Sequence, residues 1–372
     1  MTAAGLARRG SGVLAVLAVL VAPHAAGASD ARVESFGVQH EYLEDYSLFS
    51  LYPTVIARYA NLVSVSVGDR NLQQRSVGVI ASGNRGGYGV FALRLNDLGF
   101  DGGQDAQVDL AWARDFGGVT PALAVQWTES RREIGDAVQS PIGGGPLTNN
   151  LSLHGGALVD VGDTEQIEVA AEVAWLTWEE TATGRRSADN LSYRFSLRLH
   201  DELNSRVTLL PLLQVFRTDR TGRGDPDVSR SDTFNLGAAF HFRVNGSDLL
   251  VVGAAVNRYE QKTYTSGAVS DRFRRWDLPA LFAALEFDVY DWLTVRSGAT
   301  KTLDVSNLTR SAAEPETRSL TSRYFFGLGM GLHFDHFDVD ATVNPRSVFT
   351  GGYLFSGESS EPLGKVTATY YF

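Results

Sequence analysis

Long runs in which every second residue is apolar dominate this chain, and few folds accommodate such runs. Apolar side chains occupy alternate positions in residues 167–175, 191–199, 234–242 and 324–334, and again in 366–372. A strand with this pattern has one apolar face and one face suited to polar surroundings. Several runs reach about ten residues, the length that a tilted strand needs to cross a bilayer. Strands of soluble sandwiches are usually shorter, so the pattern predicts a transmembrane antiparallel β-barrel.

The connections between these runs alternate between short and long. Tight turns are expected around residues 82–85, 116–118, 162–163, 204–205, 245–247, 290–292 and 335–337. Longer polar loops are expected near residues 133–149, 181–189, 219–231, 263–272, 306–317 and 357–362. Short turns on one side of the membrane and long loops on the other are typical of outer-membrane barrels.

Counting the runs predicts an all-β barrel of about 16 strands within residues 61–372. The first strand is expected near 62–68 and the last at 366–372. The first hairpin, in 62–82, has short strands, and without it the count falls to 14. An even number is expected for a single-chain bacterial barrel. A barrel of this size leaves a lumen that the side chains of the wall cannot fill.

Composition narrows the functions that such a barrel can have. The chain of 372 residues has no cysteine, which excludes disulfides and thiolate chemistry. Its mean hydropathy is −0.10, as expected where only alternate residues contact lipid. Beyond residue 28, no apolar stretch reaches the roughly 18 residues that a spanning helix requires. The formal net charge of −10 argues against nucleic acid as a partner.

The first 28 residues have the features of a secretory signal peptide. Arg8 and Arg9 form a short basic region, residues 12–22 are a compact apolar run, and Ala26-Gly27-Ala28 offers a cleavage site. We therefore expect residues 1–28 to be removed after export. An exported barrel is expected in the outer membrane of a Gram-negative bacterium.

The other end of the chain agrees with this destination. The last strand places Tyr370 and Phe372 on its apolar face, and Phe372 is the final residue of the sequence. This ending resembles the C-terminal signature that barrel-assembly machinery recognises in outer-membrane barrels. The resemblance implies that this machinery and the lipids of the outer membrane are partners of the chain.

Residues 29–60 are expected to lie outside the wall and to plug the lumen. The stretch is rich in aromatic residues and lacks strict alternation, and Pro53 would interrupt a central strand ladder. We expect a segment with this much apolar surface to be covered inside the barrel and not free in the periplasm. The residues expected to form the plug are Tyr42, Tyr46, Phe49, Tyr52 and Pro53.

This segment resembles the lumenal hatch of the FadL-type long-chain fatty-acid channels. Both have an acidic residue, a short aromatic run and a proline-containing motif directly before the first strand. The family usually has Asn-Pro-Ala where this chain has Tyr52-Pro53-Thr54. The resemblance implies a channel through which hydrophobic small molecules diffuse, with a lateral opening where a strand of the wall kinks.

Charged residues occupy the face of the strands that is expected to line the lumen. The lumen-lining residues are expected to be Arg94, Glu168, Glu172, Arg194, Arg198, His200, His241, Arg243, Glu286 and Arg296. They either line a polar pathway that sorts solutes by charge, or pair with one another and with the plug to hold the interior closed. Both interpretations are open, because the set contains both signs of charge.

The sequence gives little sign of catalysis or metal binding. Ser152 and His154 share a strand face, but no third residue completes a triad and no nucleophile elbow is present. His333 and His336 are three apart, which in a strand places them on opposite faces. We therefore expect no enzyme activity, no metal site and no cofactor.

The leading hypothesis is an outer-membrane channel for the passive uptake of hydrophobic or amphipathic small molecules. One alternative is a polar diffusion porin lined by the charged residues named above. Another is a structural or adhesive protein of the outer membrane that acts through its surface loops. The small-molecule solute is not specified by the sequence, and neither is the choice between a monomer and a trimer.

Overall fold

We describe a computed structural model of the chain. It describes residues 29–68, 75–82, 88–97, 106–131, 146–180, 185–186, 190–221, 228–245, 248–265, 268–310, 317–343 and 363–372. The expected signal peptide lies outside the described residues, and so do most residues of the expected long loops.

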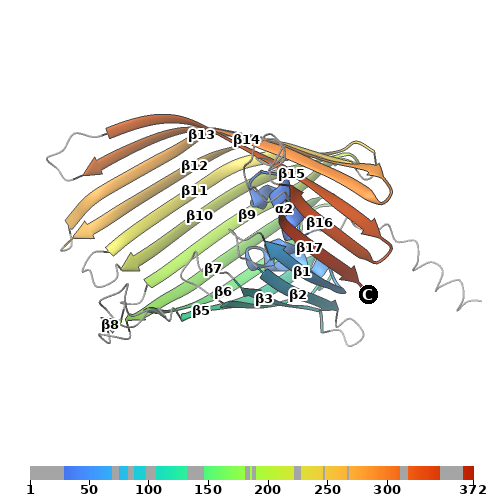
Figure 1. The fold of residues 1–372 in the computed structure, drawn as a ribbon, viewed down its shortest axis with the longest axis horizontal. Coiled ribbons are helices and arrows are strands. Elements are labelled where there is room, and N and C mark those ends of the chain that lie inside the picture. The colour runs from blue at the N-terminus through green and yellow to red at the C-terminus, as the bar shows by residue number, and fades with distance from the viewer. Residues whose placement is uncertain are drawn as a thin grey trace, which may run out of the picture.

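Sixteen antiparallel strands form one closed wall (Figure 1). The strands are β1 (Leu62–Gly68), β2 (Arg75–Ser82), β3 (Val90–Asp97), β4 (Ala106–Ala113), β5 (Val119–Arg131), β6 (Pro146–Asp160), β7 (Glu165–Glu180), β9 (Asn190–Asn204), β10 (Val207–Thr221), β11 (Val228–Arg243), β12 (Leu249–Thr265), β13 (Ala268–Tyr290), β14 (Leu293–Arg310), β15 (Thr317–Phe334), β16 (Phe337–Val343) and β17 (Leu363–Tyr371). A two-residue strand, β8 (Arg185–Arg186), pairs only with the end of β7.

The barrel closes where the first strand meets the last. β1 pairs with β2 on one side and with β17 on the other, and Leu62 lies opposite Tyr371. The prediction of 16 strands, which includes the short first hairpin, is therefore confirmed. Every neighbouring pair is antiparallel, as short turns between consecutive strands require.

The two faces of the wall follow the alternation of the sequence. In β9, Leu191, Tyr193 and Phe195 are exposed on the outside, whereas Ser196 and Arg198 are buried inside. A wall that exposes apolar side chains outward and turns polar side chains inward is built for a bilayer. The protein is an outer-membrane β-barrel.

The short turns lie where the alternation predicts them. β9 and β10 are joined through residues 205–206, β13 and β14 through 291–292, and β15 and β16 through 335–336. The prediction of a long loop at 263–272 is wrong, because β12 and β13 continue on either side of residues 266–267. The described polar residues there belong to the two strands.

The wall is much taller on one side than on the other. The described strands β1 to β4 have 7 or 8 residues each, whereas β12 to β15 have 17 to 23. The long strands β10 to β14 extend together to one side in Figure 1. They project beyond the short strands at the end opposite the tight turns.

One strand is interrupted in the middle of the wall. The ladder between β12 and β13 shifts register after Asp277, and the ladder between β13 and β14 shifts at the same place. Leu278 and Pro279 are therefore paired with neither neighbour. Proline has no N–H to donate, so within a sheet it is found at edges or at such breaks.

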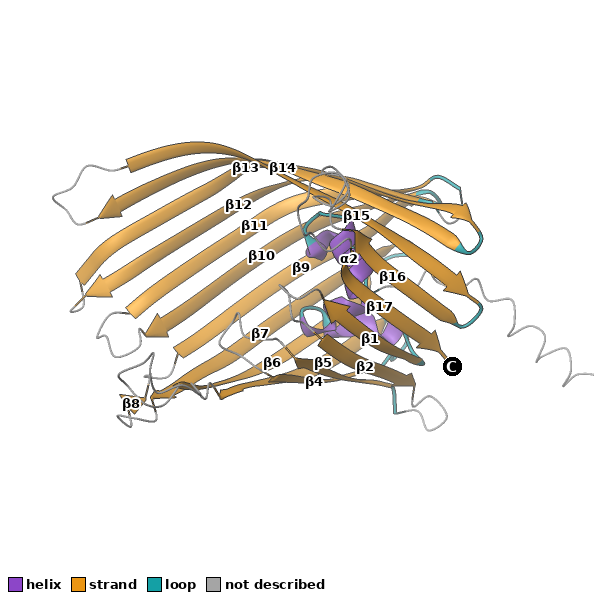
Figure 2. Cartoon of the chain, viewed as in Figure 1, coloured by secondary structure: helices purple, strands orange, loops and turns teal. Residues whose placement is uncertain are grey.

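Residues 29–60 lie inside the barrel, near the end with the tight turns (Figure 2). They form the α-helix α2 (Asp30–Ser35) and the 3₁₀-helices η2 (His40–Tyr42), η3 (Tyr46–Ser50) and η4 (Pro53–Arg58). We call residues 29–60 the N-terminal segment. No helix among the described residues is long and apolar enough to cross a bilayer.

Local sequence signals start three of these helices. The Ser29 hydroxyl accepts a hydrogen bond from the Arg32 backbone N–H at 3.1 Å and caps α2. Asp45 caps η3 in the same way, accepting from the Ser47 N–H at 2.8 Å. Pro53 occupies the first position of η4, where a missing N–H costs nothing.

The N-terminal segment touches opposite sides of the wall. α2 packs against β14 to β17, η2 contacts β10, and η4 packs against β3 to β6. Its apolar side chains, such as Phe49 and Ile56, belong to the same buried cluster as the small wall residues Ala92, Ala113 and Ala124. Short side chains on the inner wall leave the volume that the bulky residues of the segment fill.

Glycines on β14 and β15 let the backbone of the segment come close to the wall. A Cβ atom at Gly298 would overlap the carbonyl oxygen of Phe36, and one at Gly327 would overlap that of Ser35. Gly37, which follows α2, has a φ of +60° and lies against Gly327. Larger residues at these wall positions would exclude α2 from its place.

Candidate functional site

The candidate site is the lumen at the level of the N-terminal segment, where buried charges join the segment to the wall. Arg32 of α2 donates to Glu286 of β13 through Nε at 2.8 Å and through Nη2 at 2.9 Å. Arg296 of β14 donates to the same carboxylate at 2.5 Å and also pairs with Asp340 of β16. The Ser29 hydroxyl donates to Asp340 at 2.6 Å. All five side chains are buried, so the network ties α2 to three strands.

A second network holds the middle of the segment. Arg198 of β9 donates to Glu168 of β7 at 2.5 Å and 2.8 Å, and its guanidinium lies 3.7 Å from the ring centre of Tyr52. The same guanidinium donates to the carbonyl oxygens of Glu41 and Leu43 at 3.1 Å and 3.3 Å. One arginine therefore donates hydrogen bonds both to a wall carboxylate and to backbone carbonyl oxygens at η2 and just after it.

Two wall histidines contact the segment beside this arginine. The Nδ1 atom of His200 lies 2.8 Å from a carboxylate oxygen of Glu44, and its Nε2 atom lies 3.4 Å from Glu168. The Nε2 atom of His241 lies 2.8 Å from the carbonyl oxygen of Tyr42. Both histidines are buried.

A third arginine holds η3 against β3. Arg94 donates to Asp109 of β4 at 2.7 Å and to the carbonyl oxygen of Ser47 at 3.2 Å. Its guanidinium lies 4.4 Å from the ring centre of Phe49. Arg94 and Arg198 thus both pair with a wall carboxylate and donate to the backbone of the segment. Arg296 is joined to the segment only through the carboxylates Glu286 and Asp340.

Seven of the ten residues expected to line the lumen take part in these networks. They are Arg94, Glu168, Arg198, His200, His241, Glu286 and Arg296. Glu172 and Arg194 lie nearer the long-loop end and pair with each other at 3.5 Å. Arg243 is exposed at the opposite end, near the tight turns.

The five residues expected to form the plug are all buried: Tyr42, Tyr46, Phe49, Tyr52 and Pro53. The ring of Tyr42 packs 4.8 Å from that of Phe282 on β13, and the Tyr46 hydroxyl lies 3.2 Å from that of Thr369 on β17. Burial raises the pKa of Tyr52 to about 12. The structure thus brings these side chains together inside the barrel, against strands from different sides of it.

Asp45 stands out among the ionisable groups of the segment. Its side chain is fully buried and lies 3.5 Å from Arg32. Burial raises its pKa to about 6, against the opposing effects of the Arg32 charge and the Ser47 hydrogen bonds. Arg32 itself stays charged, because Glu286 and Asp45 outweigh the burial that would lower its pKa.

An amphipathic cavity of about 540 Å³ lies on the long-loop side of the segment. Its apolar lining includes Leu48, Leu51 and Phe325. Its charged lining has both signs and consists of Arg94, Arg194, Lys365, Asp30, Glu34 and Glu41. Such a volume holds a small organic molecule. A second cavity of about 300 Å³ lies on the tight-turn side and is lined mainly by polar residues, including Glu44, Glu202 and Arg243.

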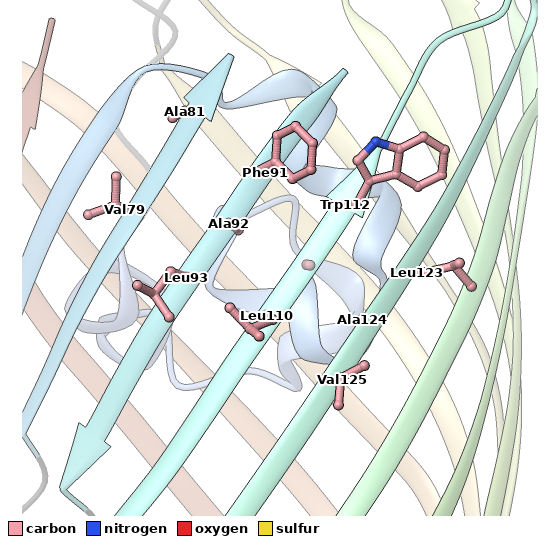
Figure 3. A pocket seen from close by; sticks show the side chains of 11 residues that line it. Val79, Ala81, Phe91, Ala92, Leu93, Leu110, Trp112, Leu123, Ala124 and Val125 are labelled. Carbon is pink, nitrogen blue, oxygen red and sulfur yellow. The ribbon is translucent and has the colours of Figure 1, made fainter. Parts of the chain in front are cut away.

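An apolar pocket of about 560 Å³ lies on the outer face of β2 to β5 (Figure 3). Phe91, Trp112 and Leu123 stand up from neighbouring strands around it, and Ala92 and Ala124 lie at its base. Helices of the segment lie behind this part of the wall in Figure 3. The ladders from β2 to β5 have no register shift, so the wall behind the pocket is continuous. The pocket therefore faces the lipid and does not open into the lumen.

Tyr370 and Phe372 lie on the outside of the last strand, as the alternation predicts. Both rings are exposed, and the Phe372 N–H donates to the carbonyl oxygen of Asn61 at 3.0 Å. The terminal residue is thereby joined to the start of the first strand. Their role as an assembly signal stays a prediction.

Sequence reasoning missed the partners that complete the networks. Asp109 and Asp340 face the lumen beside arginines, and Ser29 reaches Asp340 from the start of the segment. Both aspartates lie on the inner face of their strands, but the pattern of one strand does not show which inner residues of other strands they meet. Among the residues that the structure describes, no three His, Asp or Glu side chains are grouped as a metal site requires.

No protein family model matches the chain, and no curated protein matches it. Several solved structures are similar to it. A Pseudomonas aeruginosa FadL homologue has a TM-score of 0.46 and 11% identity, over 93% of this chain and 98% of the homologue. CdiB from Escherichia coli has a TM-score of 0.47 and 12% identity, over 84% and 62%.

A larger barrel shares the fold over part of its length. The ferric-catecholate import receptor Fiu from E. coli has a TM-score of 0.41 and 8% identity, over 76% of this chain. The aligned part is 50% of Fiu, so the chain spans about half the length of that receptor. At these values the likeness concerns the barrel fold alone, and the fold itself rests on the strand ladders described above.

Proposed function

We propose that the protein is an outer-membrane channel for the passive uptake of small amphipathic molecules, and that the N-terminal segment is its plug. The observation that carries this proposal is the position of the segment. It contacts opposite sides of the wall through buried arginine networks and lies between two cavities, one amphipathic and one polar. A solute that enters from the long-loop side would reach the amphipathic cavity first.

The amphipathic cavity suits a molecule with an apolar body and a polar group. Leu48, Leu51 and Phe325 offer apolar contact, and Arg94 and Arg194 lie at the same cavity. Both arginines already pair with wall carboxylates, so an anionic solute would share them with Asp109 and Glu172. Such sharing favours weak binding, which suits release into a passive pathway.

The break in β13 is the best candidate for the lateral opening that the FadL-type resemblance implies. Leu278 and Pro279 make no ladder pairs, and Leu278 is exposed on the outer surface. The break also lies near the amphipathic cavity. Phe325, which lines the cavity, is opposite Thr300, and Thr300 is opposite Phe282 on the lumenal side of β13, four residues after Leu278.

Planar-bilayer conductance tests the plug directly. The refolded chain from Ser29 onward would be compared with a variant that lacks residues 31–58, in which the wall from Leu62 onward is intact. We expect the complete protein to be nearly silent and the truncated protein to show large, stable conductance. Resistance of both barrels to unfolding in SDS at room temperature is the folding control.

The other outcomes separate the alternatives. Steady conductance from the complete protein would contradict the plug and favour a polar diffusion porin. Silence from both proteins would indicate a closed barrel and favour a role for the surface loops. After a positive result, uptake of a fluorescent amphiphile into vesicles would distinguish amphipathic solutes from small ions.

A further inference from the structure

The outer face of β10 to β13 changes from apolar to charged along the strands. Below the change, Leu236, Val252 and Leu281 are exposed apolar residues, with 50%, 41% and 49% of their surfaces accessible. Above it lie nine charged residues of the same outward face, which we call the charged patch. They are Arg217, Asp219, Arg230, Asp232, Arg258, Glu260, Lys262, Arg272 and Arg274.

The register places these residues in rows across four strands. Arg217 lies opposite Asp232, Asp232 opposite Glu260, and Glu260 opposite Arg274. The next row toward the loops consists of Asp219, Arg230, Lys262 and Arg272. Residues directly opposite in a ladder share one face of the sheet. The patch is therefore one continuous surface and belongs to the outside of the barrel.

One buried carboxylate serves four cations within this surface. Glu260, which is only 4% exposed, pairs with Arg258 at 2.5 Å, Arg274 at 3.4 Å, Lys262 at 3.5 Å and also with Arg272. These four side chains remain between about a quarter and two fifths exposed. The other two arginines of the patch pair one to one with aspartates. The surplus of positive charge thus lies on β12 and β13, on a chain with a net charge of −10.

Aromatic rings place the patch at the edge of the bilayer. The guanidinium of Arg258 lies 5.5 Å from the ring centre of Trp276, and that of Arg230 lies 5.8 Å from the ring centre of Tyr264. Tryptophan and tyrosine prefer the boundary between hydrocarbon and headgroups. The tight turns lie at the far end of these strands, so the patch faces the outer leaflet.

An apolar pocket lies directly below the charges. It has a volume of about 360 Å³, and its lining consists of the apolar residues Val215, Phe234 and Trp276 with Thr233, Asp232 and Arg258. Val215, Phe234, Arg258 and Trp276 lie opposite one another in consecutive ladders. The arrangement offers an apolar surface for an acyl chain and cations for the group to which that chain is attached.

We propose that the charged patch binds the phosphate-bearing headgroup of an outer-leaflet lipid, with an acyl chain in the pocket below. Arginine guanidinium groups suit phosphate because they can donate two parallel hydrogen bonds to it. A phosphate would provide the negative charge that Glu260 alone does not supply to its four cations. The pocket beneath the charges favours a lipid over a soluble anion. This proposal is independent of the transport function.

Lipid binding to the full chain in detergent, measured by native mass spectrometry, tests the proposal. The probes are diphosphorylated lipid A, its dephosphorylated form and inorganic phosphate. Arg272→Gln with Arg274→Gln should weaken the binding of diphosphorylated lipid A by roughly tenfold or more. Glu260→Gln should strengthen it, because the competing carboxylate is removed.

Matched controls separate this effect from general loss of charge or fold. Arg114→Gln with Arg206→Gln removes the same charge at the tight-turn end and should leave lipid binding unchanged. Retention of the folded gel mobility shows that each variant is a closed barrel. Equal affinity of the patch variant and the wild type would overturn the proposal. So would equal binding of dephosphorylated lipid, or full displacement of the lipid by millimolar inorganic phosphate.

Discussion

Single arginines connect the wall to the N-terminal segment, and each has more than one partner. Arg198 contacts a carboxylate, an aromatic ring and two carbonyl oxygens, whereas Arg32 joins Glu286 to Asp45. Buried charges are costly unless every partner is present, so these networks favour one docked position of the segment over others. A segment held in this way has one defined docked position and would lose several contacts together on leaving it.

Asp45 should make docking of the segment depend on pH. Its pKa in the docked state is about 6, above its ordinary value of 3.8, so the docked state binds the proton more tightly. Docking is therefore strongest below about pH 4 and weakens as the pH rises through 6, by at most about 3 kcal/mol. Protection of the segment from added protease, measured between pH 4 and 7.5, reports this change.

The variant Asp45→Asn isolates the contribution of this carboxyl group. Arg32, Asp30 and Tyr59 act on Asp45 electrostatically, and the wall histidines His200 and His241 also contact the segment. The difference between the wild type and the variant is therefore the quantity to compare. We expect Asp45→Asn to be protected at pH 7.5 nearly as well as the wild type at pH 4. Parallel pH profiles for the two proteins would contradict this role.

For single residues, the sequence predicts which face of a strand a side chain lies on better than it predicts which other side chain it contacts. Alternation placed Arg94, Arg198 and Arg296 in the lumen, because a strand residue has only two directions to choose from. The pairing of Arg296 with Asp340 crosses the intervening strand β15 at Gly331, which has no side chain between the two charges. A pattern within one strand does not show such a pairing. The pKa of Asp45 depends on burial by the whole segment and could not be predicted either.

The docking of α2 depends on the glycines that face it from β14 and β15. A methyl group at Gly298 would overlap the Phe36 carbonyl, and one at Gly327 would overlap that of Ser35. The wall therefore has a strip without side chains where the helix lies. The position of α2 against the wall therefore depends on these wall glycines and is not specified by the sequence of the helix itself.

Gly298→Ala should displace α2 while the barrel stays closed. The added Cβ atom meets backbone atoms, which cannot move aside as a flexible side chain can. We expect the variant to show frequent channel openings in planar bilayers and reduced protease protection of the segment. Gly155→Ala is the matched control, because its Cβ would meet only Leu123 at 3.6 Å. Identical conductance of the two variants would contradict the proposed role of the glycines.

At the scale of elements, the period of two predicts strands well and their ends poorly. The strands of the hairpin in 62–82 are short, yet its first strand closes the barrel through pairing with β17. The expected loop at 263–272 is strand, because polar residues at the outer face continue the alternation beyond the bilayer. The same continuation, from Val252 through Arg258 and Lys262, could have revealed the charged patch.

In the whole molecule, the sequence indicates that residues 29–60 are not part of the wall, but it does not indicate how they are arranged inside the barrel. The aromatic content of residues 29–60 and Pro53 argued against a strand, and the segment indeed lies inside the wall. Its four short helices and its contacts with opposite sides of the lumen depend on the shape of the closed barrel. The tall side of the wall, β10 to β14, carries both the break at Leu278 and the charged patch.

Reversible cross-linking of the segment to the wall tests the central proposal most directly. The backbone N–H of Ala31 donates to the Thr367 hydroxyl at 3.3 Å, which makes these two positions candidates for a disulfide between the segment and the wall. The chain has no cysteine of its own, so Ala31→Cys with Thr367→Cys creates a single possible bridge. The readout is the entry of a fluorescent amphiphile into vesicles that contain the protein.

If the segment is a movable plug, oxidation should reduce this entry to the level of empty vesicles, and a reductant should restore it. Each single cysteine variant should be insensitive to both reagents. Equal entry through the oxidised and reduced double variants, with the bridge confirmed by gel mobility, would contradict the account.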